Sequence, residues 1–167
     1  MTAITIREAT ADDAPGITRI GLENSAFNAQ IAPELFRIPD VEGFVEFIAD
    51  DSEWRAQPTS LALVAEAEGE IAGYLEASLQ EPMETARWQG QRDLGKIRLH
   101  INYVGTADEY KRRGVATRLV ETAEEWGRAC GAAVAVCDTY IDSPLSVPFW
   151  EERMGYDRRA IIFRKPL

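Results

Sequence analysis

The chain has few of the residues on which metal and disulfide chemistry depend. Its 167 residues include two cysteines and one histidine. Cys130 and Cys137 lack the spacing of a metal site, and each stands among apolar residues, as reduced cysteines in a protein core commonly do. We therefore expect neither a disulfide nor a bound metal ion.

Positive charge and long apolar runs are also scarce. The 18 Lys and Arg residues stand against 28 Asp and Glu, a formal net charge of -10, whereas a domain that binds nucleic acid normally carries net positive charge. No apolar run approaches the ~20 residues of a membrane span, and residues 1–3 lead into a strand pattern without a basic and apolar signal region. We expect a cytoplasmic protein that binds neither nucleic acid nor a membrane. The acidity favours solubility and would also suit a cationic substrate.

The length and the composition indicate one globular domain over residues 1–167. A chain of 167 residues is long enough for one core and too short for two ordinary domains. Hydrophobic residues make up 46% and charged residues 28%, which is close to the average of globular proteins and excludes a largely disordered chain.

Hydrophobic periodicity predicts an α/β fold. Alternating patterns or continuous β-prone apolar runs predict strands over residues 4–7, 61–67, 71–79, 96–106, 132–137 and 160–163. Helical spacing predicts helices over residues 12–23, from Pro39 to about Ile48, and over 114–130 and 143–154. Residues 24–38 are expected to be irregular, and residues 81–95 form a long loop. The strand, helix and strand over 96–137 form a β-α-β unit, so its two strands should be parallel neighbours.

The strand over residues 96–106 is predicted to have one core face and one polar face. Strict alternation assigns to the core Ile97, Leu99, Ile101 and Tyr103. It assigns to the other face Arg98, His100, Asn102 and Val104.

The loop after this strand concentrates positive charge around a glycine. It reads Tyr110-Lys111-Arg112-Arg113-Gly114-Val115-Ala116-Thr117 and opens the helix over 114–130. Successive backbone N–H groups can turn toward one anion here, and the helix N-terminus adds partial positive charge. Gly105 and Gly114 are nine residues apart and no Gly-Lys-Ser/Thr is present, which excludes a dinucleotide or nucleoside triphosphate loop. The loop therefore predicts a binding site for another kind of phosphate.

Two motifs carry a resemblance to a known family. Lys111-Arg112-Arg113-Gly114-Val115-Ala116 resembles the Gln/Arg-x-x-Gly-x-Gly/Ala signature of the GNAT superfamily of N-acetyltransferases. The string from Phe149-Trp150 to Gly155-Tyr156 resembles the aromatic pair and Gly-aromatic ending of that family. The order of predicted elements fits over nearly the whole chain. The resemblance implies a mixed, largely antiparallel sheet with splayed central strands and helices on both faces.

The same resemblance implies acetyl-CoA as the acyl donor and no metal. Backbone N–H groups from Arg112 to Thr117 would bind its pyrophosphate, and the pantetheine arm would pair with the strand, where an N–H near Thr106 could polarise the thioester carbonyl. Ser143 stands where relatives often carry an asparagine that contacts pantetheine. The residues so implied in cofactor binding are Val104, Gly105, Thr106, Lys111, Arg112, Arg113, Gly114, Val115, Ala116, Thr117, Ser143 and Trp150.

The chain differs from many family members at the position of the residue that protonates the departing CoA sulfur. Many members place a tyrosine at the position of Trp150 to protonate the departing sulfur, and an indole cannot do so. Tyr140 and Tyr156 are substitutes nearby in the sequence, although each also suits ordinary packing, and a thiolate of modest basicity can leave unaided. Asp138 and His100 are the candidate bases, although Asp138 suits a helix or turn cap at least as well and a lone histidine is more often structural.

We therefore expect an N-acetyltransferase that moves an acetyl group from acetyl-CoA to a primary amine of a small molecule, peptide or protein by direct attack. The alternative is a module that binds or senses acyl-CoA without turnover, which Trp150 favours. Glu23 and Glu34 are possible partners of the acceptor ammonium. Many relatives pair through sheet edges or C-terminal strands, so residues 161–163 would serve a homodimer or the core.

Overall fold

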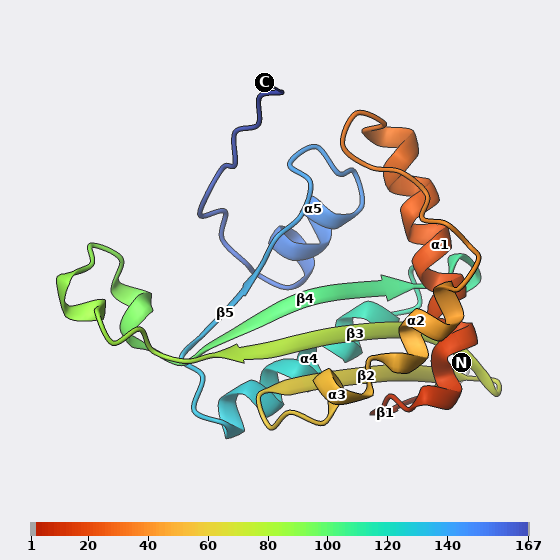
Figure 1. Ribbon diagram of the computed structural model, residues 1–167, viewed down its shortest axis with the longest axis horizontal. Helices are drawn as coiled ribbons and strands as arrows, with labels where there is room; N and C mark the ends of the chain where they lie inside the picture. The colour runs from red at the N-terminus through yellow and green to blue at the C-terminus, as the bar shows by residue number, and fades with distance from the viewer. Residues whose placement is uncertain (1–2, 167) are drawn as a thin grey trace. The chain divides into compact units, whose positions relative to one another are not determined.

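The computed structural model describes residues 3–166. Its centre is a mixed five-stranded sheet in the order β1-β2-β3-β4-β5, drawn in Figure 1. The strands are β1 (Ile4–Glu8), β2 (Ser60–Ala67), β3 (Glu70–Gln80), β4 (Arg98–Thr106) and β5 (Val134–Cys137). The first four pair antiparallel and β5 pairs parallel with β4. This confirms the mixed α/β fold and the predicted β-α-β unit.

The chain forms two compact units, one up to Cys137 and one from Asp138 onward. The helices of the first unit are α1 (Ala14–Ile31), α2 (Phe44–Asp50), α3 (Ser52–Arg55) and α4 (Val115–Ala129). Short 3-10 turns include η1 (Ala11–Asp13) and η4 (Asp108–Tyr110). The second unit contains α5 (Ser146–Pro148) and a π-helical turn over Phe149–Arg153.

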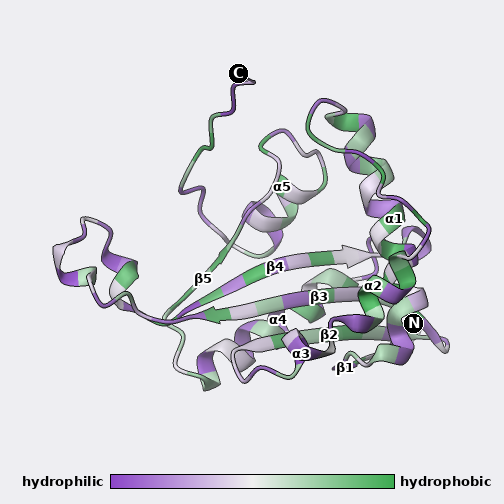
Figure 2. Cartoon of the chain, in the orientation of Figure 1, coloured by the Kyte–Doolittle hydropathy of each residue, from purple (hydrophilic) through white to green (hydrophobic). Residues whose placement is uncertain are grey.

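Helices cover both faces of the sheet in the first unit. α4 buries Val115, Leu119 and Ala123, and it passes so close to β4 that a Cβ at Gly127 would lie 3.0 Å from Leu99. Figure 1 shows α4 behind the strands and α2 and α3 in front of them. Figure 2 shows hydrophobic residues recurring along β2, β3 and β4, which is where the buried core lies.

Helix α1 is longer than the sequence pattern predicts. It continues to Ile31, through residues expected to be irregular. Asn24 to Ile31 contains no glycine or proline, so nothing in the backbone chemistry stops the helix there. The helix ends where Pro33 disfavours the helical conformation for Ala32, whose φ is -149° and ψ 70°.

The predicted alternation along β4 is wrong beyond Ile101. Ile101 pairs with Ala77 and Tyr103 pairs with Glu76, so Asn102 is an extra residue without a partner across the strand. Such a β-bulge shifts the side-chain alternation by one position. Tyr103 consequently faces α1, where Asn24 Nδ2 lies 3.2 Å from its hydroxyl, while Leu99 faces α4.

The second unit differs from prediction at both of its elements. The helix predicted over 143–154 is confined to residues 146–153, and its last turn is π-helical, with Met154 N donating to Phe149 O at 3.0 Å. A π-turn takes up one additional residue, and this turn lies between the aromatic pair and Gly155. The strand predicted over 160–163 is absent, and Ile162 and Phe163 are 84% and 91% exposed. A β-prone sequence forms a strand only where another strand pairs with it.

Candidate acetyl-CoA site and active site

The loop between β4 and α4 is curved by two residues in the left-handed region. Arg112 has φ 61° and Gly114 has φ 83°. A left-handed residue within a short turn brings successive N–H groups to one side of the backbone, and this concavity binds anions. Gly114 is the N-cap of α4, so the predicted cradle lies at the N-terminus of a 15-residue helix.

The N-terminus of α4 is open toward an anion. No side chain caps the helix at Gly114, and the Gly114 carbonyl accepts the first helical hydrogen bond, from Arg118 N at 3.1 Å. A Cβ built on Gly114 would meet nothing within 4 Å. The first N–H groups of any helix have no partner within it, so they and the positive end of the helix dipole are available to a phosphate.

Two of the cationic side chains near the loop contact other parts of the protein, and the other two are exposed. Lys111 forms an ion pair with Asp108 and lies 5.6 Å from the centre of the Phe27 ring. Arg118 donates to the carbonyl oxygen of Ile4. Arg112 and Arg113 are exposed. The loop therefore offers two arginines at its surface beside the backbone cradle.

A polar network fixes this loop to α1. Glu23 accepts a hydrogen bond from Asp108 N at 2.8 Å, and its other oxygen lies 3.6 Å from Arg19. Arg19 also binds Glu109 at 3.0 Å and the carbonyl oxygen of Ile71 at 3.0 Å. Glu23 thus positions the cradle, whereas Glu34 is exposed. The sequence pattern could not distinguish these two roles because the pairing spans 85 residues of chain.

The second half of β4 has an open edge. Pairing with β5 ends at Ile101 and Cys137, and β4 continues to Thr106 without another strand on that side among the described residues. Figure 1 shows the two strands diverging from the end at which they pair. Ala107 N donates to Ala72 O at 3.0 Å, and because an antiparallel ladder alternates, the N–H and C=O groups of Val104 and Thr106 point away from β3. The strands β4 and β5 therefore splay apart as the family resemblance implies, and the backbone groups of Val104 and Thr106 are directed into the gap between them.

Four polar side chains gather on the α1 face of β3 and β4. Tyr74 donates to Glu76 at 2.6 Å, and the rings of Tyr74 and Tyr103 lie 6.0 Å apart. Asn24 donates to the Tyr103 hydroxyl. Burial raises the pKa of Tyr103 to about 12 and raises that of Tyr74 further. Burial also raises the pKa of Glu76, and the hydrogen bond from Tyr74 offsets part of that shift.

His100 lies on the same face, beyond the bulge. Its Nδ1 is 2.6 Å from Asn102 Oδ1, which also accepts a hydrogen bond from Ser78 Oγ at 3.2 Å. The imidazole is half-buried and oriented by this contact. Its part as a base stays a prediction.

The remaining predicted residues belong to the second unit. Ser143 is buried, and its Oγ accepts a hydrogen bond from Ser146 N at 3.2 Å. Trp150 is also buried, and its ring packs 4.9 Å from both Phe149 and Tyr156. Asp138 is exposed and Tyr140 half-buried. The unit thus brings Trp150 and Tyr156 together, and the roles of Asp138, Tyr140 and Ser143 stay predictions.

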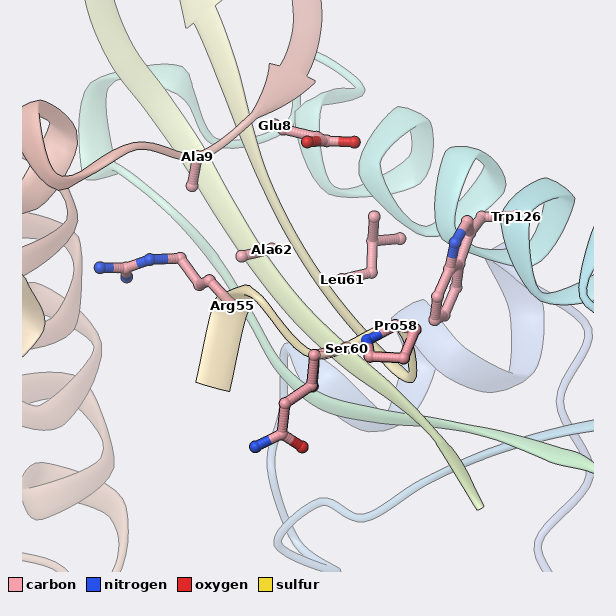
Figure 3. Close-up of a pocket in the computed structure, with 9 residues that line it drawn as sticks. Glu8, Ala9, Arg55, Pro58, Ser60, Leu61, Ala62 and Trp126 are labelled. Carbon is pink, nitrogen blue, oxygen red and sulfur yellow. The ribbon is translucent and has the colours of Figure 1, made fainter. Parts of the chain in front are cut away.

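A pocket of about 230 Å³ lies elsewhere, at the end of β2. Figure 3 shows Arg55, Leu61 and Trp126 around it. Trp126 is about three helical turns along α4 from Gly114, so this pocket is separate from the cradle. Among residues 3–166, no group of three His, Cys, Asp or Glu side chains is arranged to hold a metal ion. No helix in that part of the chain is both long and apolar enough to cross a membrane.

Comparisons with known proteins agree with this geometry. The model of the acetyltransferase (GNAT) family matches residues 28–156. A mutant of the BH1408 protein of Bacillus halodurans has 18% sequence identity and a TM-score of 0.81, with 98% of this chain and 99% of that chain covered. The glucosamine-6-phosphate N-acetyltransferase of Arabidopsis thaliana has 15% identity and a TM-score of 0.66, with 98% of each chain covered.

A third solved structure is the aminoglycoside N-acetyltransferase AAC(6')-Iy in complex with CoA. It has 17% identity and a TM-score of 0.67, with 100% of this chain and 97% of that chain covered. A search of curated proteins found no match. The structures share the fold, and the family model covers most of the sequence, including the cradle and the open edge of β4. This chain is a member of the GNAT acetyltransferase family.

Proposed function

We propose that the protein is an N-acetyltransferase that moves an acetyl group from acetyl-CoA to a primary amine of a small molecule or peptide. One observation carries the proposal: the open edge of β4 leads directly to the uncapped N-terminus of α4. In acetyl-CoA an amide-rich arm is followed by a diphosphate. The arm can pair with the open edge of β4, and the diphosphate can bind at the N-terminus of α4. Membership of the GNAT family supports the same donor.

The diphosphate would be held by the backbone between Arg112 and Thr117. The open space at Gly114 admits the phosphate oxygens, and the exposed Arg112 and Arg113 add charge-assisted hydrogen bonds. Each such bond is worth about 1.5–3 kcal/mol, and the helix dipole adds about 0.3–1 kcal/mol. The residues present therefore fit this group.

The pantetheine arm would pair with the outward backbone groups of Val104 and Thr106. When bound, acetyl-CoA supplies an acyl group that is activated as a thioester. The Thr106 N–H is directed toward the open edge, where it would donate to the thioester carbonyl and stabilise the negative charge that develops there. His100 or Asp138 would take the proton that the acceptor ammonium must lose before the neutral amine attacks.

The acceptor is proposed from charge and from related proteins. The chain carries a formal net charge of -10, which attracts a cationic amine. Two proteins of the same fold are named for acetylating amino sugars, an aminoglycoside and glucosamine-6-phosphate. A compact polar amine is therefore the first class to test.

The experiment is an assay of free thiol with acetyl-CoA and a panel of amines. Wild-type protein should release thiol only when an accepted amine is present, and Gly114→Glu should abolish release because its carboxylate enters the phosphate site. Gly43→Glu is the matched control, since Gly43 is also an N-cap, has φ 77°, and a Cβ there would meet nothing within 4 Å. Equal effects of the two substitutions would contradict the assignment of the cradle.

The same experiment separates the enzyme from a module that only binds acyl-CoA. The buried, ring-packed Trp150 favours that second function, because an indole cannot protonate the sulfur. Binding of acetyl-CoA without thiol release from any amine would support the module.

A further inference from the structure

The bulge at Asn102 places one phenol over the open half of β4. Tyr103 would face the core if the strand alternated regularly, and the extra residue turns it to the α1 face. Its hydroxyl lies above Gly105, close enough that a Cβ on that glycine would be 2.5 Å from the oxygen. Gly105 is flanked by Val104 and Thr106, the two residues directed into the open edge.

The Tyr103 hydroxyl accepts one hydrogen bond and donates none within the described residues. Asn24 Nδ2 donates to it at 3.2 Å, and a phenol oxygen can accept from one group while its own proton goes to another. Tyr74, whose ring is 6.0 Å away, differs in this respect because its proton is directed to Glu76 at 2.6 Å. The two neighbouring tyrosines therefore offer different chemistry, and only Tyr103 has a proton to give.

We propose that Tyr103 donates the proton that the CoA sulfur takes up when the thioester breaks. The inference rests on the proposed function, since it needs the thioester beside Val104 and Thr106. As the N–C bond forms and the C–S bond breaks, the amine nitrogen loses one proton and the sulfur gains one. Tyr103 passes its hydroxyl proton to the sulfur and takes up the proton from the nitrogen, so the phenol ends as it began.

The surroundings of Tyr103 suit this relay. Burial raises its pKa to about 12, so the hydroxyl stays protonated at neutral pH and a free phenolate would be costly. Because it receives a proton as it gives one, the relay does not require that phenolate. The hydrogen bond from Asn24 holds the oxygen in place. Tyr103 therefore has a hydroxyl proton to donate, which the indole of Trp150 lacks.

The test compares Tyr103→Phe with Tyr74→Phe in the thiol-release assay. Each substitution removes one hydroxyl from the same pair of neighbouring rings. Tyr103→Phe should lower kcat about 10²-fold, the usual contribution of a positioned acid, while KM for acetyl-CoA and Tm stay near wild type. Tyr74→Phe should leave kcat within about threefold of wild type, because its hydroxyl serves Glu76.

A second acyl donor distinguishes proton transfer from a structural effect. With 4-nitrothiophenyl acetate, whose thiol is far more acidic, the leaving group needs no proton, and the deficit of Tyr103→Phe should shrink below about threefold. An equal deficit with both donors, an unchanged kcat, or equal losses in the two variants would each overturn the role of Tyr103. If wild-type protein releases no thiol with any amine, the proposed function fails instead.

Discussion

Replacing Gly105 by alanine tests whether the hydroxyl of Tyr103 needs the space that this glycine leaves. The new methyl group would lie 2.5 Å from the Tyr103 oxygen and 2.7 Å from Ile20 Cγ2, where ordinary contact begins at 3.4 Å. The hydroxyl must move by about 1 Å, because packed interiors have little free volume. That movement breaks the hydrogen bond from Asn24.

The expected cost is that of overpacking a core, about 1–3 kcal/mol. For a chain of this length, 2 kcal/mol corresponds to a fall in Tm of about 4–8 °C. Urea denaturation followed by circular dichroism measures the unfolding free energy, and the thiol-release assay measures kcat in the same samples. Gly90→Ala is the control, since a Cβ there would meet nothing within 4 Å.

If Gly105→Ala were as stable and as active as Gly90→Ala, the Tyr103 hydroxyl would not need the space that Gly105 leaves. A double variant adds a finer check. Removing the hydroxyl with Tyr103→Phe relieves one of the close contacts, so the loss of stability from Gly105→Ala should be smaller in that background, a coupling expected of residues in contact. Strict additivity would show that the two positions do not touch.

Two further predictions concern charge. Hydrogen bonds from Arg7 hold the pKa of the buried Asp13 below its ordinary value, so the pair stabilises the fold above the unfolded-state pKa and this stability is lost as pH falls through the lower folded-state pKa. Asp13→Asn should therefore lower the unfolding free energy by about 2 kcal/mol at pH 7, and this loss should shrink below about pH 4. Asp12 is exposed, so Asp12→Asn should change the unfolding free energy little. Equal pH profiles of the two variants would contradict this prediction. Burial raises the pKa of Glu76, so its carboxylate costs stability as pH rises through that pKa. Glu76→Gln should be more stable than wild type at pH 8 and equal to it below about pH 4. If the variant were less stable than wild type at pH 8, the Glu76 carboxylate would stabilise the fold, contrary to this prediction.

The parts of the fold that local chemistry determines could be predicted from the sequence. The β2–β3 hairpin turns at Glu68 and Gly69, which are both left-handed, and a glycine between two alternating runs predicts such a turn. The cradle follows from Gly114 between a strand pattern and a helical one. Each of these features depends on residues that are close in the chain.

The parts of the fold that the sequence does not predict depend on contacts between residues far apart in the chain. The bulge at Asn102 exists only in the pairing with β3, so period-two alternation assigns Tyr103 to the core and gives no sign that its hydroxyl lies over Gly105. The local signal for the bulge is Val104, an apolar residue that regular alternation assigns to the polar face. Residues 160–163 have strand-forming side chains, and their conformation depends on a pairing partner that the local sequence does not specify.

Calorimetric titration tests whether the N-terminus of α4 binds the diphosphate of CoA. Wild-type protein is titrated with CoA and, separately, with pantetheine, which lacks the diphosphate. Losing one or two charge-assisted hydrogen bonds and the helix dipole should cost about 2 kcal/mol or more. CoA should therefore bind at least about 30-fold more tightly than pantetheine, and equal affinities would show that the N-terminus of α4 does not bind the diphosphate.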